Sequence, residues 1–169
     1  MTWPHDDPAS LDAFYGPLSL GRDGRPTRKW EGEHLESITS PYPLAIAWMP
    51  GVTVRRVLCH RKVAGSLARI FAAILAHYGT PEAVAAARMH LYGGCYAFRP
   101  VRGGNRLSVH AYGAAVDLDP EGNPLGKEHD CGPLMMPAPV VAIFEAEKWT
   151  WGGRFRNRPD CMHFQAATP

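Results

Sequence analysis

Apolar residues between positions 63 and 78 recur at intervals of three and four, which is the period of a helix with one buried face. These residues are Val63, Leu67, Ile70, Phe71, Ile74, Leu75 and Tyr78. Gly79 follows them as a helix-ending glycine, and Thr80-Pro81 then supplies a cap and a first-turn proline for an alanine-rich helix over 81–89. A further helix is predicted over 138–149.

Short segments rich in β-branched and other apolar residues predict strands. We expect strands over 44–48, 52–58, 91–98, 114–118 and 161–166. In the last of these, Cys161, His163 and Gln165 share one face, because side chains alternate along a strand. The mixture of strands and helices with short antiparallel connections predicts an α+β fold, in which helices flank a central antiparallel sheet.

The chain is predicted to be a single domain that begins with an N-terminal arm. Residues 1–42 are rich in Pro, Gly and charge, and apolar residues such as Trp3 and Phe14 indicate that this arm packs on the body, residues 43–169. The segment 119–137 is rich in Gly and Pro and has no periodicity. Long irregular loops in compact domains are usually functional, so we expect this one to border a functional site.

Composition and charge exclude some classes of protein. A chain of 169 residues, 46% hydrophobic and 20% charged, can bury a core without disulfide bonds. Its net charge of +2 and pI near 8.4 are too mild to indicate nucleic-acid binding, although they permit an anionic polymer such as a cell wall as a partner. We find no secretory signal and no apolar run long enough for a transmembrane helix, so we expect synthesis in the cytoplasm without a signal peptide.

The four cysteines are widely spaced and form no CxxC motif; they are Cys59, Cys95, Cys131 and Cys161. Without an export signal, this spacing predicts four free thiols. Cys131 adjoins three other polar residues of the long loop, Glu128, His129 and Asp130. Because this cluster lacks a partner at metal-ligand spacing, we interpret it as surface residues, or at most a lid.

Two separate fragments carry the residues expected to bind a metal. His110 and Asp117 flank a glycine-bearing turn, and His163 lies on the last predicted strand. Three protein ligands with one open position are typical of a catalytic zinc site, whereas a structural site has four ligands, usually including cysteines. The sequence therefore predicts a zinc hydrolase, with Cys161 as an unneeded fourth candidate ligand.

The residues beside these ligands suggest roles in catalysis. Asp160 stands three residues before His163, and a carboxylate there can take a proton from water and hand it to the leaving amine. Arg99, or else Arg102, can stabilise the oxyanion or bind a substrate carboxylate, although either can equally be a solvated charge. Trp151 is a candidate substrate contact, with a place in the core as the stronger alternative.

Three motifs in order resemble the VanY-type D-Ala-D-Ala carboxypeptidase family of zinc peptidases. They are Ser108-x-His110-x-x-Gly113-x-Ala115-x-Asp117, Trp151-Gly152-Gly153 and Asp160-x-Met162-His163-Phe164. The resemblance covers roughly residues 90–166 and is looser before them. The family includes phage endolysins that cut the L-Ala–D-Glu bond of peptidoglycan.

The resemblance implies a role for each matching residue. His110, Asp117 and His163 match the ligands of one zinc ion per chain, and Asp160 matches the catalytic acid/base, where many relatives carry Glu. Ser108 and Arg99 match positions that handle substrate and developing charge. At Phe155, members more often carry Trp. The implied fold is a small α+β domain with a central antiparallel sheet that holds the metal.

We expect a monomeric zinc peptidase that acts on peptidoglycan stem peptides, with neither nucleic acid nor membrane insertion. The favoured bond is L-Ala–D-Glu, as for an endolysin made in the cytoplasm and released to the wall at lysis. The alternatives are a D-Ala-D-Ala carboxypeptidase and, in another class, a non-catalytic cell-wall binding module. The module would be expected to lack Asp160 or a metal ligand, and the sequence keeps them all.

Overall fold

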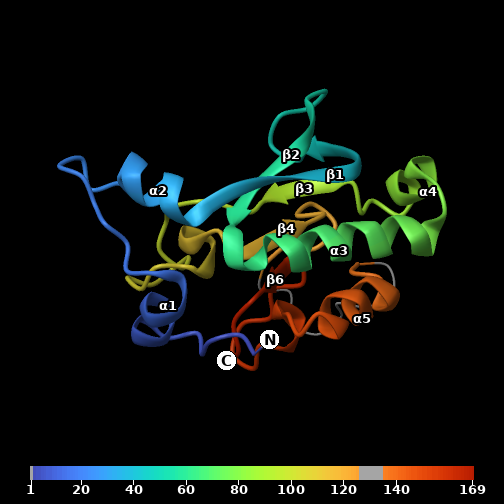
Figure 1. Cartoon of the computed structure of the whole chain (residues 1–169). Coiled ribbons are helices and arrows are strands. Elements are labelled where there is room, and N and C mark those ends of the chain that lie inside the picture. Colours follow the sequence, from blue (N-terminus) through green and yellow to red (C-terminus); the bar gives the residue numbers. More distant parts are fainter. Residues whose placement is uncertain (1, 126–134) are drawn as a thin grey trace.

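The computed structural model describes residues 2–125 and 135–169 (Figure 1). Within these residues the helices are α1 (Pro8–Tyr15), α2 (Arg28–His34), α3 (Arg61–Tyr78), α4 (Pro81–Ala86) and α5 (Ala138–Ala146), with single 3-10 turns η1 (Val109–Tyr112) and η2 (Gly152–Arg154). The strands are β1 (Leu35–Ile46), β2 (Thr53–His60), β3 (Leu91–Gly94), β4 (Ala115–Leu118), β5 (Thr150–Trp151) and β6 (His163–Gln165).

The strands form one sheet in the order β2-β1-β3-β4-β6-β5. Most neighbouring strands are antiparallel, but β1 and β3 run parallel, with Ala45 opposite Leu91 and Ile46 opposite Tyr92. The α+β class is therefore confirmed, while the sheet is mixed rather than purely antiparallel. The parallel pair arises because α3 and α4 carry the chain across between β2 and β3, and such crossovers allow parallel pairing.

Helix α3 lies along the sheet and supplies much of the core (Figure 1). The residues predicted to form its apolar face are mostly fully buried, and Gly79 ends the helix at φ +87° as expected. The cap of α4 is also confirmed, because the Thr80 hydroxyl accepts a hydrogen bond from the Ala83 N–H. Buried residues from Trp3 to Ala167 form one continuous cluster, so the described residues make a single domain.

The N-terminal segment is more ordered than its composition suggests. Asp7 and Thr27 cap α1 and α2, and β1 begins at Leu35, so residues 35–42 of the predicted arm belong to the sheet. The segment also pairs with the other end of the chain, where the Asp6 N–H donates to the Thr168 carbonyl at 2.7 Å. Both termini consequently lie side by side in Figure 1.

The elements that carry the predicted site are shorter than expected. The strand expected over 91–98 ends at Gly94, and the last strand covers His163–Gln165 only. Helix α5 ends at Ala146 because Lys148 takes a positive φ of 67°. Among the described residues, no helix is both long and apolar enough to cross a membrane.

Candidate metal centre and active site

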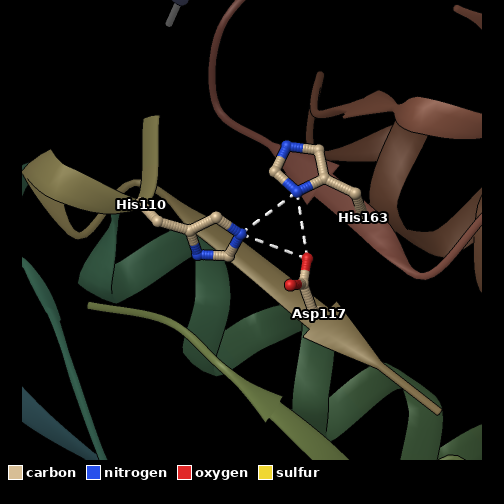
Figure 2. Close-up of side chains that lie close together, drawn as sticks. All are labelled: His110, Asp117 and His163. Carbon is tan, nitrogen blue, oxygen red and sulfur yellow. Dashed lines mark hydrogen bonds and ion pairs between the residues drawn. The ribbon is translucent and has the colours of Figure 1, made fainter. Parts of the chain in front are cut away.

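Asp117 and His163 are brought together by strand pairing. They are direct register partners of the antiparallel strands β4 and β6, so their side chains leave the same face of the sheet. Asp117 Oδ1 and His163 Nδ1 lie 3.0 Å apart. Both residues are almost completely buried, and Figure 2 shows them converging on His110.

His110 reaches the same point from the 3-10 turn η1. The Ser108 hydroxyl accepts the His110 N–H at 3.3 Å and starts the turn, and Gly113 ends it in the left-handed conformation at φ +69°. A Cβ atom on Gly113 would also meet the His60 backbone nitrogen at 2.9 Å, so only glycine fits. This local geometry explains the glycine between the two ligands in the sequence.

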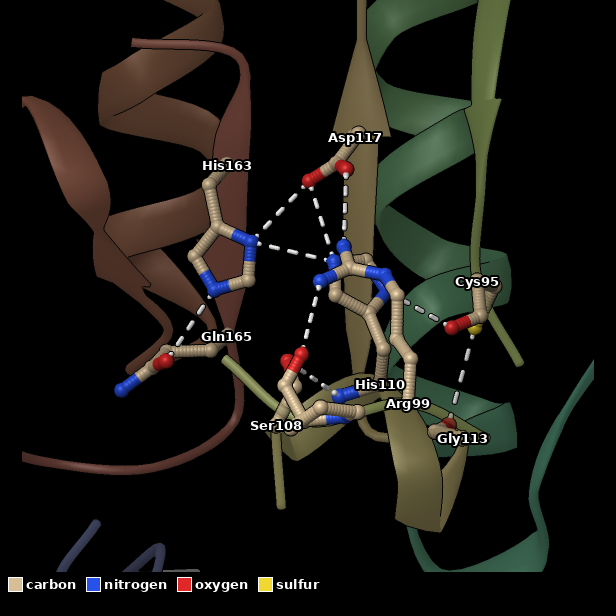
Figure 3. Close-up of polar contacts among 9 residues, drawn as sticks. Cys95, Arg99, Ser108, His110, Gly113, Asp117, His163 and Gln165 are labelled. Atoms are coloured by element: carbon tan, nitrogen blue, oxygen red, sulfur yellow. Dashed lines mark hydrogen bonds and ion pairs between the residues drawn. The ribbon is translucent and has the colours of Figure 1, made fainter. Parts of the chain in front are cut away.

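The hydrogen bonds around the two imidazoles determine which nitrogens face inward as acceptors. The Cys95 carbonyl lies 2.8 Å from His110 Nδ1 and can only accept, so Nδ1 carries the proton and Nε2 a lone pair (Figure 3). His163 Nε2 likewise faces the Gln165 amide at 3.0 Å, which leaves His163 Nδ1 as the inward lone pair. The Asp117 carboxylate adds a third acceptor.

Three acceptor atoms thus face one another at short range. His110 Nε2 lies 3.1 Å from both Asp117 Oδ1 and His163 Nδ1, and the three atoms form a compact group. Three ligands bonded to one zinc ion at about 2.0–2.1 Å would stand roughly 3.3 Å apart. The spacing and the converging lone pairs fit a bound cation, which removes their mutual repulsion. The described residues offer this one group of three His, Cys, Asp or Glu ligands.

The alternative cation is a proton. Burial opposes charge on Asp117, but His110 and His163 beside it hold its pKa well below the usual range. Burial also opposes charge on His163, yet contact with Asp117 outweighs it and raises the pKa of His163 above its ordinary value. A metal-free protein therefore binds a proton readily at this centre, and metal binding should release it.

A cavity of about 680 Å³ opens onto the three ligands and contains Asp160. Asp160 Oδ1 is buried and has no hydrogen-bond partner within the described residues. Burial raises the pKa of Asp160 above its usual value, and the nearby charge of Asp117 acts in the same direction. A carboxyl group with a raised pKa, free to bond a substrate, suits proton transfer.

The Trp151-Gly152-Gly153 motif positions Asp160. The Asp160 N–H donates to the Gly152 carbonyl at 2.9 Å, and a Cβ on Gly152 would stand 2.5 Å from the Asp160 carbonyl oxygen. Glycine is therefore required for the two segments to approach. Asp160 lies in the turn before β6, as its offset from the face of His163 suggested.

The other predicted site residues divide into two groups. Arg99, Arg102 and Ser108 line the cavity, and the Arg99 guanidinium points towards Asp117, with Nη2 4.0 Å from Oδ2 (Figure 3). Trp151 is not among the residues that line this cavity, as far as the structure describes them. Its indole N–H donates to the Cys161 carbonyl at 2.9 Å, so the structure favours the packing role over substrate contact.

Several residues of the site were given no role from the sequence. Phe155 was noted only as a departure from the family, yet it lines the cavity and its ring lies 6.1 Å from that of His163. Asp6 also lines the cavity, although it lies far from the other site residues in sequence. The Cys95 carbonyl bonds His110 through its backbone, which residue type does not reveal.

The expectation of four free thiols is wrong. Cys59 and Cys95 are buried and free, but Cys161 is disulfide-bonded. Wide spacing in sequence does not prevent two cysteines from meeting in the fold. The polar cluster of the long loop lies outside the described residues; it comprises Glu128, His129, Asp130 and Cys131. Leu125, at the described end of that loop, lines the cavity.

One comparison with known proteins finds a match. A family model described as D-alanyl-D-alanine carboxypeptidase matches residues 102–166, which include all three candidate ligands and Asp160. The match supports the VanY-type zinc peptidase resemblance inferred from the motifs. Neither a curated protein nor a solved structure matches the chain.

Proposed function

We propose that this chain, in which residues 102–166 carry the match to the VanY-type D-alanyl-D-alanine carboxypeptidase family, is a zinc peptidase that hydrolyses peptidoglycan stem peptides. One observation carries the proposal. The two inward imidazole lone pairs and the Asp117 carboxylate converge beside Asp160, a buried carboxyl group without a partner among the described residues. A metal-binding module without catalysis has no need of that carboxyl group.

His110, Asp117 and His163 would hold the ion. When bound, zinc supplies a Lewis acid that polarises the scissile carbonyl and lowers the pKa of water. Asp160 would take a proton as water attacks and return it to the leaving amine, a role that its raised pKa supports. The Arg99 guanidinium would stabilise negative charge that develops on the carbonyl oxygen.

The charge of the cavity supports a substrate with several carboxylates. Among the described residues, its lining contains six arginines, Arg99, Arg102, Arg106, Arg154, Arg156 and Arg158, against three acidic residues, Asp6, Asp117 and Asp160. Arg106 pairs with Asp6, and Arg154 pairs with Glu145 outside the lining. Arg102, Arg156 and Arg158 have no carboxylate partner among the residues described. Guanidinium groups bind carboxylates through two parallel hydrogen bonds, and stem peptides carry free carboxylates.

Two bonds of the stem peptide remain candidates, and we favour L-Ala–D-Glu. A cavity of about 680 Å³ falls within the range that encloses drug-sized ligands, so it can take a peptide longer than a terminal D-Ala-D-Ala. The D-Glu α-carboxylate of the stem peptide is free, and Arg99 or Arg102 in the cavity lining could bind it. The printed description of the matching family favours the second candidate, D-Ala-D-Ala carboxypeptidase.

Digestion of purified peptidoglycan tests both the activity and the bond. The zinc-loaded protein should release fragments with new N-terminal D-Glu, identified by mass spectrometry, and His163→Ala should release none because it lacks a ligand. Release of free D-Ala alone would identify the activity as that of a D-Ala-D-Ala carboxypeptidase and not of an endopeptidase. Zinc binding without release of any fragment would instead indicate a non-catalytic wall-binding module.

A further inference from the structure

We propose that Gln165 and Asp6 position His163 for metal binding, so that the N-terminal segment is a working part of the active site. The proposal rests on the metal-binding function proposed above. Asp6 lies outside the segment matched by the family, and 159 residues separate it from Gln165.

The first step is the orientation of the Gln165 amide. Its Nε2 lies 3.3 Å from Asp6 Oδ2 and 3.4 Å from the Ala167 carbonyl oxygen, and both of these atoms only accept hydrogen bonds. The NH2 group must therefore face Asp6 and Ala167, and the amide oxygen must face the other way. Without such partners, a Gln side chain can take either of two orientations, which exchange the positions of the amide oxygen and the NH2 group.

The second step fixes the tautomer of His163. The Gln165 amide oxygen lies 3.0 Å from His163 Nε2, and it can only accept, so Nε2 carries the proton (Figure 3). Nδ1 then has its lone pair directed at His110 and Asp117. Hydrogen bonds of this kind orient metal-binding imidazoles and raise their basicity. Gln165 can reach His163 because residues two apart share one face of β6.

The third step is the anchoring of Asp6 itself. Its carboxylate is paired with Arg106, whose Nη2 lies 3.2 Å from Oδ2, and its backbone N–H donates to the Thr168 carbonyl. Arg106 belongs to the loop that leads to His110, so one carboxylate connects the N-terminal segment with two ligand-bearing segments. The Asp6 side chain is about 15% exposed, which protects the pair from full solvent screening.

The competing interpretation is that Asp6 only attaches the N-terminal segment to the body. A partly exposed ion pair contributes about 0–1 kcal/mol to stability and would leave metal affinity unchanged. Zinc affinity of the folded protein therefore separates the two roles, and it does not depend on any assay of hydrolysis.

The test compares zinc dissociation constants, measured by competition with a chromophoric chelator, for the wild type and four variants. Gln165→Leu removes the acceptor for His163 and should weaken zinc binding about 10- to 100-fold. Asp6→Ala should weaken it about 3- to 10-fold, because Gln165 keeps Ala167 as a partner. Asp6→Asn retains an oxygen for the Gln165 amide and should stay within about twofold of the wild type.

Asp7→Ala is the matched control. Asp7 is the neighbouring residue and caps α1 by accepting the Ser10 N–H at 2.9 Å, so its loss should destabilise the segment by about 0.5–2 kcal/mol. Its zinc affinity should equal that of the wild type. Thermal unfolding of the metal-free variants verifies that each one folds.

Unchanged zinc affinity in both Gln165→Leu and Asp6→Ala would overturn the proposal, as would an equal loss in Asp7→Ala. If Gln165→Leu does not fold, the comparison of Asp6→Ala with Asp6→Asn and Asp7→Ala decides alone. A wild type that binds no zinc would remove the proposed function and this inference together. A wild type that binds zinc no more tightly than Gln165→Leu and Asp6→Ala do removes only the inference.

Discussion

Replacing Asp160 by asparagine should separate catalysis from metal binding. The substitution keeps the shape of the side chain but removes its ability to accept and return a proton. Asp160 Oδ1 has no hydrogen-bond partner in the described parts of the chain, and the bond to Gly152 uses the Asp160 backbone. The substitution therefore breaks no hydrogen bond at Oδ1, and the variant should fold. It should be at least as stable as the wild type, because burial and Asp117 disfavour a charge at this position and together outweigh the attraction of His163, His110 and Arg102.

The expected loss is confined to the chemical step. Proton transfer by a positioned group contributes about 10²- to 10⁴-fold to rate, which corresponds to about 2.7–5.4 kcal/mol of transition-state stabilisation. The zinc dissociation constant should stay within about threefold of the wild-type value, since Asp160 supplies none of the three candidate ligand atoms. A loss in kcat with nearly constant KM is the corresponding kinetic signature.

The assay is the initial rate of fragment release from soluble stem peptides, with zinc content and thermal unfolding measured on the same samples. Asp160→Glu is the matched control, because it restores a carboxylate on a longer side chain and should recover most of the rate lost in Asp160→Asn. Near-normal turnover by fully zinc-loaded Asp160→Asn would refute the assignment. Glu128 or Asp130 of the long loop would then be the next candidates for the base.

Two further predictions concern groups outside the reaction. Burial lowers the pKa of His60 to about 4, so between pH 6.5 and 4 the unfolded chain binds a proton that the folded protein does not, and stability falls as pH falls through this window. The loss in the free energy of unfolding is at most about 3 kcal/mol. Urea unfolding at pH 7.5 and 5 should show that this free energy depends less on pH in His60→Gln than in the wild type. An equal pH dependence in the two proteins would contradict the prediction. Alkylation of the denatured, unreduced protein should label Cys59 and Cys95 but label Cys161 only after reduction. Labelling of Cys161 without reductant would contradict the disulfide.

Sequence periodicity predicted the parts of the fold that depend on local pattern. Helix α3 is long and amphipathic, so its apolar spacing alone located it within two residues at its start. Strand pairing is a long-range property, and the parallel contact between β1 and β3 was missed for that reason. The early start of β1 was missed because residues 35–42 contain a proline and several polar residues, a composition that suggests a loop.

The same distinction between local pattern and long-range contact applies to the candidate site. The metal ligands and Asp160 could be proposed because their chemistry requires particular residue types in ordered motifs. Trp151 fitted a motif too, and the structure packs it against the core, the stronger of the two alternatives that the sequence left open, since a motif does not say which way a side chain faces. Asp6 and Gln165 could not be proposed as a pair. They meet only because Pro4–Asp6 runs beside Thr168, a contact that no local pattern encodes.

The two halves of the metal centre also differ in how firmly the fold fixes them. Asp117 and His163 are opposite each other in a ladder, so their separation follows from strand geometry and survives changes elsewhere in the chain. His110 instead depends on a 3-10 turn that requires a glycine at position 113 to end it. The His110 ring is also held by the hydrogen bond that it donates to the Cys95 carbonyl. A side chain at position 113 should therefore displace one ligand while leaving the other two in place. On this reasoning the glycine of the first motif is as necessary to metal binding as the histidine, although it contributes no ligand atom.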